Sequence, residues 1–283
     1  MISYAFTAAP PALCYLVTGD DCALLIDTML GFGNLKKYCA SITDKPVYVI
    51  NTHAHFDHFG GNFHFDSCIM PHKDIAFFMG QLGYTKEQVA ELARQQSLPE
   101  YKDMICTDDF ADVSPIKVYP VYGGDVFDLG GTVLEVIDAG GHTAGSVVLL
   151  DRTHSILFSG DACNGNTLLE FDNSLSIPEY METLLRLKNH QSGFDMVYGG
   201  HEVFDSSIID EAIETVAKVL AGTDAKCERK GMMGGTVFYA AEKVKDGYER
   251  VDGKHFNMSY TADKVKSPDG KKPPITLDIL KTM

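Results

Sequence analysis

The sequence predicts an α/β fold in which β-sheets pack face to face and helices cover their outer surfaces. Apolar β-like runs alternate with segments of helical spacing, and this strand-plus-helix pattern occurs twice along the chain. The 283 residues are enough for one large domain with an additional segment. We therefore divide the chain into a main domain at residues 1–221 and a short β-rich C-terminal appendage at residues 222–283.

The first half begins with a predicted hairpin, because residues 12–18 and 23–28 are β-like runs separated by Gly19-Asp20-Asp21. The elements predicted next are a helix at 35–41, strands at 46–50 and 67–70, and a helix at 87–96. Residues 80–116 otherwise lack a clear period. Long segments of this kind are often functional in enzymes, so we expect a lid or substrate-binding insertion here.

The second half repeats the strand-rich pattern. Four β-like runs come first, at residues 116–121, 132–138, 146–151 and 155–159. A helix at 178–189, a strand at 194–198 and an acidic amphipathic helix at 206–220 follow them. Pro178 suits the first turn of its helix, where its missing N–H has no intrahelical partner to lose.

The character of the chain changes after Gly222, where the predicted strands are short. We place them at residues 236–240, 248–251 and 256–261. Asp246-Gly247 and Asp252-Gly253 are typical of hairpin turns, and the tail beyond Ser267 is rich in turn residues. We expect the appendage to form a lid or a contact surface, and its strand edges could pair in a homodimer.

Charge and composition limit the classes of partner. A formal net charge of −15 repels phosphate backbones, so we do not expect nucleic acid as a partner, and a small-molecule substrate fits better. No apolar run of about 18 residues predicts a membrane span. The first basic residue is Lys36, which argues against a secretory signal. The seven cysteines form no Cys-x-x-Cys pair, so we expect a reduced, cytoplasmic protein.

The densest group of metal-ligand types is the run His53-Ala54-His55-Phe56-Asp57-His58, which follows the predicted strand at 46–50. Imidazoles and carboxylates are the ligands that zinc and iron sites use. At strand spacing, His53, His55 and Asp57 point the same way, and a tight turn places His58 at a second position. The alternative is a surface loop of histidines without a metal, but polar clusters on loops are more often functional than structural.

Three more ligand-type residues, His142, Asp161 and His201, each follow an apolar run and at least one glycine. Glycine allows the close backbone approach and unusual dihedral angles that a crowded metal site needs. Ligands at the ends of several strands converge on one edge of a sheet, where catalytic sites commonly form. We therefore expect a metal site built from distant parts of the chain.

Together these motifs resemble the metallo-β-lactamase superfamily. The matching segments are Leu-Ile-Asp-Thr at 25–28, His-x-His-x-Asp-His at 53–58, Gly-His-Thr-x-Gly-Ser at 141–146, Ser-Gly-Asp at 159–161 and Gly-Gly-His at 199–201. They follow one another in the order that the family has. The resemblance implies the metallo-β-lactamase fold, a four-layer αββα sandwich that binds two divalent metal ions.

The resemblance also implies which residues hold the two ions. The first site matches His53, His55 and His142, the second matches Asp57, His58 and His201, and Asp161 matches the bridging carboxylate. Zinc is expected, with iron or manganese as alternatives, because nitrogen and oxygen ligands do not fix the metal. A metal-bridging hydroxide would attack the substrate. Asp57 is the expected catalytic residue, since it could also orient this nucleophile or accept a proton.

The implied activity is that of a dinuclear metal-dependent hydrolase that cleaves a small ester-like bond, in a thioester, a lactone or a related carbonyl compound. Dedicated β-lactamases of the family usually lack an aspartate at the position of Asp161, which favours the glyoxalase II-like and lactonase-like branches. Glyoxalase II proteins usually carry a helical C-terminal domain, unlike the β-rich appendage here. A phosphodiesterase of a small phosphodiester, a weak β-lactamase, a non-haem iron sulfur dioxygenase and a noncatalytic binding protein are alternatives.

Other polar and aromatic residues have less specific interpretations. Asp27 either supports the 53–58 loop from behind its ligands or caps a turn. The hydroxyls of Thr52 and Thr143 are expected to satisfy local backbone groups. Phe77 and Phe78 either line a substrate pocket or pack in the core.

Overall fold

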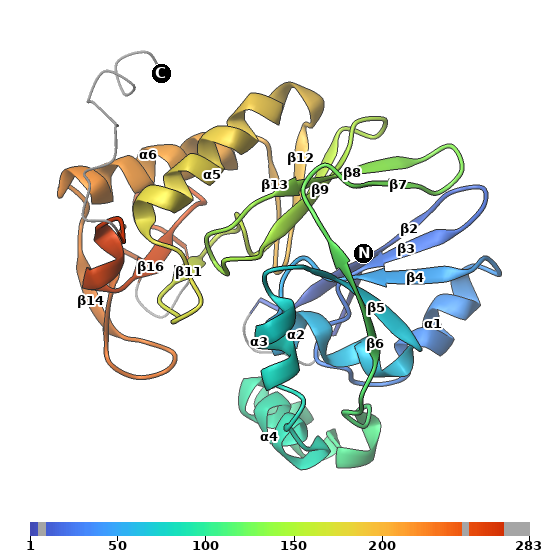
Figure 1. The fold of residues 1–283 in the computed structure, drawn as a ribbon. Coiled ribbons are helices and arrows are strands. Elements are labelled where there is room, and N and C mark those ends of the chain that lie inside the picture. Colours follow the sequence, from blue (N-terminus) through green and yellow to red (C-terminus); the bar gives the residue numbers. More distant parts are fainter. Residues whose placement is uncertain (5–9, 245–248, 269–283) are drawn as a thin grey trace.

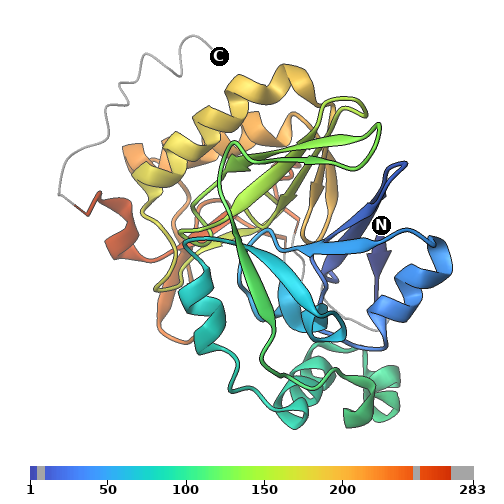
Figure 2. The same cartoon turned by 45° about the vertical axis from the view of Figure 1, so that its right-hand side comes forward.

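Two six-stranded β-sheets lie face to face, and helices lie on the outer side of each (Figures 1 and 2). The computed structural model describes residues 1–4, 10–244 and 249–268. The strand order is β1-β2-β3-β4-β5-β6 in the first sheet and β13-β12-β10-β9-β8-β7 in the second. The layers are therefore helices, sheet, sheet and helices, and the predicted αββα sandwich is confirmed.

The first sheet brings the ends of its central strands to one edge. Its strands are β1 (Ile2–Ser3), β2 (Leu13–Thr18), β3 (Ala23–Ile26), β4 (Val47–Ile50), β5 (Ser67–Pro71) and β6 (Lys117–Val121). The strands from β3 to β6 run parallel, so their C-terminal ends point the same way. Loops at the carboxyl ends of parallel strands are where α/β proteins commonly bind ligands. The accompanying helices are α1 (Leu35–Ile42), α2 (Phe56–Phe59), α3 (Ile75–Gly80) and a 3-10 helix at Gly60–His64.

β3 ends two residues before the predicted end of its run. Asp27 adopts a left-handed φ of 61°, which an aspartate tolerates better than a β-branched residue does. Its N–H donates to the carbonyl of Ile50 at 2.8 Å. The turn takes the Asp27 side chain out of the alternation of the strand, and the carboxylate ends in the interior with 2% of the residue surface exposed.

The second sheet carries two long helices on its outer side. Its strands are β7 (Val126–Asp128), β8 (Val133–Asp138), β9 (Val147–Asp151), β10 (Ile156–Gly160), β12 (Met196–Gly199) and β13 (Val203–Asp205). The helices are α5 (Ile177–His190), followed by a 3-10 turn at Gln191–Gly193, and α6 (Ile208–Ala221). Pro178 lies in the first turn of α5, as predicted, and Ser176 caps that helix together with Glu179. Gly222 ends α6 at a φ of 68°.

Strict alternation along the strands builds the cores between the layers. On β9, Val147 and Leu149 pack into the core between the sheets, whereas Val148 and Leu150 pack under α5 and α6. On β3, Leu24 likewise faces the other sheet and Leu25 faces α1. Successive side chains of a strand point to opposite faces, so a strand covered on both faces is apolar throughout.

A third, four-stranded sheet joins the C-terminal region to the rest of the molecule. It comprises, in spatial order, β11 (Thr167–Leu169), β16 (Met258–Tyr260), β15 (Thr236–Tyr239) and β14 (Cys227–Lys230). β11 pairs in parallel with β16, and a 3-10 helix at Ala262–Val265 follows. The predicted strand at 248–251 is wrong for its described part, where Arg250 forms only an isolated bridge with Lys243. The predicted turn at Asp246-Gly247 and the tail at 269–283 lie outside the described residues.

Residues 80–116 form a helical insertion. α4 (Lys86–Gln96) is followed by 3-10 helices at Pro99–Met104 and Thr107–Asp109. Val89, Ala93 and Phe110 pack with Leu30 in a small apolar core of their own. Within the described residues, none of the helices combines the length and the apolar character that crossing a bilayer requires.

Candidate metal centre

The predicted ligands meet at the edge where the C-terminal ends of β3, β4 and β10 approach one another. The 53–58 run is not an extended strand, so the expected strand spacing is wrong. β4 ends at Ile50, His53 lies in a bend, and residues 56–59 form the helical turn α2. The helical turn places Asp57 and His58 one after the other around its axis. His58 thereby lies near both His53 and His201, with ring centroids 4.1 and 5.5 Å away.

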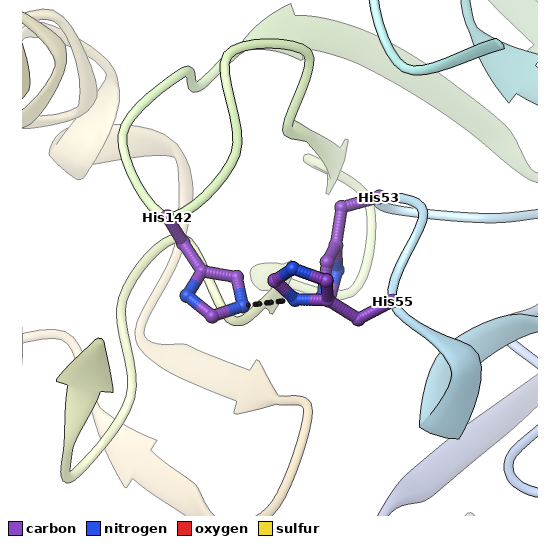
Figure 3. A group of neighbouring side chains, drawn as sticks. All are labelled: His53, His55 and His142. Carbon is purple, nitrogen blue, oxygen red and sulfur yellow. Dashed lines mark hydrogen bonds between the residues drawn. The ribbon is translucent and has the colours of Figure 1, made fainter. Parts of the chain in front are cut away.

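Three histidines form one group of potential ligands (Figure 3). One ring nitrogen from each of His53, His55 and His142 lies within 4.8 Å of the others. Nδ1 of His55 lies 2.7 Å from Nε2 of His142. The rings of Phe77 and Phe171 lie edge-on to that of His55, with centroids 5.7 and 5.0 Å away. This group therefore has nitrogen donors inside and an apolar wall on one side.

Asp57, His58 and His201 form a second group, whose donor atoms also lie within 4.8 Å of one another. Asp161 lies between the two groups. One of its oxygens is 3.5 Å from Nε2 of His58, and the other is 3.5 Å from Nε2 of His142 and 3.4 Å from Nε2 of His201. The same carboxylate thus contacts both groups of imidazoles.

The second nitrogen of most rings is held by the surrounding protein. Nδ1 of His58 lies 2.9 Å from the Asp27 carboxylate, and Nδ1 of His142 lies 2.8 Å from the Leu168 carbonyl. Nδ1 of His53 is 3.1 Å from the Thr52 hydroxyl. A proton held on Nδ1 leaves the Nε2 lone pair directed at the cluster, as a metal ligand requires.

Several buried atoms in the cluster have no hydrogen-bond partner among the described residues. They are Nε2 of His53, Nε2 of His58 and Oδ1 of Asp161. A buried polar atom without a partner costs about 1–3 kcal/mol, and a charged one costs more. These three residues form a further group of potential ligands, which links the first two, and one donor atom from each lies within 4.8 Å of the others. The donor set therefore fits divalent cations, which would satisfy these atoms together.

Burial keeps the imidazoles of the first group neutral. It lowers the pKa of His53 well below the ordinary value, and the nearby His58 charge adds to the effect. Burial, reinforced by His142, lowers the pKa of His55 to about 3, and burial also lowers the pKa of His142. These rings are uncharged at neutral pH, so their lone pairs are available to a cation.

Carboxylates reverse this effect in the second group. Burial opposes protonation of His58, but Asp161, Asp57 and Asp27 outweigh it and raise its pKa to about 10. Burial also lowers the pKa of His201, but the charge of Asp161 and its hydrogen bond outweigh this effect and raise the pKa to about 9. Burial disfavours the charged form of Asp161, but His201 and His58 hold its pKa well below the ordinary value. Without a metal, protons on these imidazoles balance the carboxylates.

Asp27 joins the cluster from behind. Its two oxygens accept hydrogen bonds from the Thr52 N–H and the Thr52 hydroxyl, both at 2.8 Å, and one of them also contacts His58. The Thr52 hydroxyl therefore donates to a buried carboxylate, and the expectation that it satisfies a local backbone group is wrong. Between the two interpretations of Asp27, the geometry favours the one in which it supports the ligand loop.

The sequence interpretation missed Asp74, which has 2% of its surface exposed. Its carboxylate accepts hydrogen bonds from the Ala54 N–H, the Thr143 hydroxyl and the Gly145 N–H. The Thr143 hydroxyl thus also donates to a carboxylate, contrary to the prediction. Asp74 follows the end of β5, and this position was a usable signal, because the other polar residues of the centre also follow strand ends.

A cavity of about 350 Å³ opens from the centre. Its lining includes Asp161 and His201 of the cluster, together with Met232, Lys254 and His255 of the C-terminal region. No described residue of 80–116 contributes to its lining. The two phenylalanines for which a pocket role was considered differ in their surroundings. Phe78 is fully buried and packs in a core with Phe59, whereas the ring of Phe77 lies beside that of His55.

Gly200 leaves no room for a side chain at the centre. A Cβ atom there would lie 2.2 Å from Oδ1 of Asp161 and 2.6 Å from Cε1 of His58. We expect Gly200→Ala to lower the free energy of unfolding by about 1–3 kcal/mol, because the added methyl must displace buried polar groups. Urea denaturation measures this loss. Gly83→Ala is the matched control, since a Cβ at Gly83 has nothing within 4 Å; equal stability of the two variants would contradict the crowding.

Known proteins with sequences similar to part of this chain include two that are named as thioesterases and one that is named as a beta-lactamase-like protein. The proteins named acyl-coenzyme A thioesterase MBLAC2 of Homo sapiens and Gallus gallus are both 29% identical, over 185 and 183 residues. The match covers 61% of this chain and 66% and 65% of theirs, so the chain spans slightly less than two thirds of the length of these relatives. The beta-lactamase-like protein 2 homolog of Caenorhabditis elegans is 26% identical over 64% of this chain and 50% of its own.

Solved structures and a family profile agree on the fold. A metallo-beta-lactamase from Pontibacter korlensis superposes with a TM-score of 0.53 at 20% identity, over 73% of this chain and 87% of its own. A metallo-beta-lactamase family protein from Thermus thermophilus superposes with a TM-score of 0.54 at 19% sequence identity. The superposition covers 75% of this chain and 76% of that protein. The profile of the metallo-beta-lactamase superfamily matches residues 8–226, which is most of the chain and includes every residue of the centre. The chain belongs to the metallo-β-lactamase superfamily.

Proposed function

We propose that this protein is a hydrolase that uses two metal ions to cleave a small ester-like bond, and that its substrate is a thioester. The observation that carries the proposal is the Asp161 carboxylate, which contacts both groups of imidazoles and leaves one buried oxygen without a partner among the described residues. A single cation held by His53, His58 and Asp161 would leave the other donors of both groups without a metal. Two cations that share this carboxylate satisfy both.

The residues divide between the ions according to their grouping. His53, His55 and His142 would hold one cation, and Asp57, His58 and His201 would hold the other. Asp161 would bind both, and Asp27 would orient His58. We propose zinc as the metal, because imidazole with a minority of carboxylate is a common donor set for this ion. Iron and manganese accept the same donors.

When bound, the ions lower the pKa of a coordinated water and offset the negative charge that develops on the attacked carbonyl. The residues around them do the rest. Asp57 keeps 36% of its side chain exposed, the most among the three carboxylates of the cluster, and can accept a proton from water or orient it. Asp161 stays ionised and does not compete for that proton. The buried side of the cluster excludes bulk water and strengthens these interactions.

Thioesters are the favoured substrates for two reasons. The relatives that share 29% identity are named acyl-coenzyme A thioesterases. The cavity beside Asp161 and His201 has apolar side chains, including Leu168, Phe204 and Met232, that suit an acyl chain or a thiol arm. The net charge of −15 continues to argue against nucleic acid. The seven free cysteines fit a reducing compartment, and we propose a cytoplasmic location.

We expect Asp161→Ala to lose most of its bound zinc and to lower kcat/KM for acyl thioesters by at least about 100-fold. The variant removes the one group that both ions share. Metal content is measured by mass spectrometry after dialysis, and hydrolysis by release of free thiol. Asp66→Asn is the matched control, because Asp66 is a surface aspartate with 97% of its side chain exposed. An Asp161→Ala protein that hydrolyses thioesters normally without metal would overturn the proposal.

Zinc binding should release protons from the second group. His58 and His201 have pKa values of about 10 and 9 without metal, so both are protonated at pH 7.5, whereas a ligand imidazole must be neutral. We expect on the order of two protons per chain to leave these rings at pH 7.5, and fewer as the pH rises through about 9. Calorimetric titration in buffers of different ionisation enthalpy measures the release. A release that does not change between about pH 7.5 and 9.5 would contradict the protonated state.

A further inference from the structure

The carboxylate of Asp74 joins the two loops that carry the three-histidine group. One oxygen accepts the Ala54 N–H at 3.0 Å, and Ala54 lies between His53 and His55. The same oxygen accepts the Thr143 hydroxyl at 2.7 Å, immediately after His142. These bonds tie together the backbone positions that determine how far the three rings lie from one another.

The other oxygen of Asp74 fixes the second loop again. It accepts the Gly145 N–H at 2.9 Å, and a Cβ at Gly145 would lie 2.3 Å from this oxygen. The close approach requires the glycine. Both oxygens of Asp74 are therefore occupied by hydrogen bonds from the two loops, and the side chain is a support of the centre rather than a ligand in it.

An ordinary structural role does not explain this side chain. Asp74 precedes α3, where an aspartate commonly caps the helix, but its side chain makes no capping hydrogen bond. The carboxylate instead lies buried between two loops, one about 20 residues before it in sequence and the other about 70 residues after it. Burying a charge there is costly, and it is offset because three donors converge on it.

The two groups of the centre rest on different carboxylates. Asp27 contacts His58 directly, in the second group, and reaches His53 only through the Thr52 hydroxyl. Asp74 contacts no ligand ring, and its hydrogen bonds lie next to His53, His55 and His142. Changes at Asp74 should therefore act on the first group more than on the second.

We propose that Asp74 is a positioning residue that sets the spacing between the 53–58 and 141–146 loops, and that it thereby determines the metal affinity of the three-histidine position. This inference rests on the proposed function only in assuming that metal binds there. It assigns Asp74 no contact with substrate or metal.

Asp74→Asn tests the contribution of the carboxylate to the loop spacing, because it changes the hydrogen bonding of the side chain with almost no change of its shape. An amide has one acceptor oxygen where the carboxylate has two, and its NH₂ group cannot accept a hydrogen bond. In one orientation the Gly145 N–H loses its acceptor, and in the other the Ala54 N–H does. Either way one backbone N–H of the two loops faces an amide NH₂ instead of an acceptor, which weakens the link between the loops.

The test is titration of metal-free protein with Co²⁺, in which each ion is located by the shifted imidazole N–H signals in the NMR spectrum. For Asp74→Asn we expect the affinity of the position held by His53, His55 and His142 to fall at least about tenfold. The affinity of the position with His58 and His201 should change less than about threefold. At limiting cobalt, the shifted N–H signals of His53 and His142 should therefore be weaker in Asp74→Asn than in the native protein.

Thr143 supplies a matched pair of further variants. Thr143→Val removes the hydroxyl that donates to Asp74 and keeps the shape, so it should weaken the same position in the same direction. Thr143→Ser keeps the hydroxyl and should bind cobalt as the native protein does. This pair keeps the inference testable if Asp74→Asn folds poorly.

Equal weakening of both positions, or no weakening of either, would overturn the role of Asp74, because a merely structural support has no reason to select one position. The proposed function fails separately. If the native protein binds a single ion, the dinuclear centre is wrong, and Asp74 is then judged by whether its variants weaken that ion when it lies among the three histidines. If no ion binds among them, both fail.

Discussion

Negative charge buried among imidazoles is the constraint on which the centre depends. Asp161 lies between two groups of histidines, and its ionised form is favoured by His58 and His201 although burial opposes it. Without a metal, this balance requires protonated rings in one group beside neutral rings in the other. With two divalent ions in place, the same carboxylate would be compensated by metal charge. The arrangement is thus suited to exchanging protons for cations.

The scaffold stabilises this crowded cluster by anchoring its side chains and loops from outside. Asp27 holds the Thr52 backbone and the His58 ring, and Asp74 holds two loops to each other. The strand ends supply these positions because β3, β4 and β5 run parallel and end at one edge of the sheet. Gly200 provides the remaining space, since any Cβ there would collide with Asp161.

Much of the fold was predictable because both sheets are covered on both faces. Central strands such as β3 and β9 are nearly continuous apolar runs, and the glycines and aspartates between the strands mark many of the turns. The ends of strands were less predictable: β3 stops at Ile26 because Asp27 turns into a left-handed conformation, which depends on tertiary hydrogen bonds to Thr52. The prediction of a strand at residues 248–251 was wrong in its described part for a similar reason. The Arg250 side chain is buried in hydrogen bonds with Thr215, Phe256 and Asp252, and local β propensity does not encode them.

For the centre, residue types could be predicted and supporting contacts could not. The seven expected ligands carry a recognisable spacing, and the structure brings all of them together. Asp74 also follows a strand end, but it belongs to no such motif, and two of its three partners, Ala54 and Gly145, offer only backbone N–H groups, which every sequence contains. The wall of the cavity was equally hidden. Part of it comes from the C-terminal region, and pairing of β11 with β16 is one of the contacts that bring this region to the centre.

Anomalous diffraction at the zinc edge, from crystals of zinc-loaded protein, tests the central claim most directly. Two peaks should appear, one about 2.0–2.2 Å from nitrogens of His53, His55 and His142 and one at similar distances from Asp57, His58 and His201. The Asp161 carboxylate should contact both. A single peak, or two peaks of which Asp161 contacts only one, would contradict a centre built around a shared carboxylate.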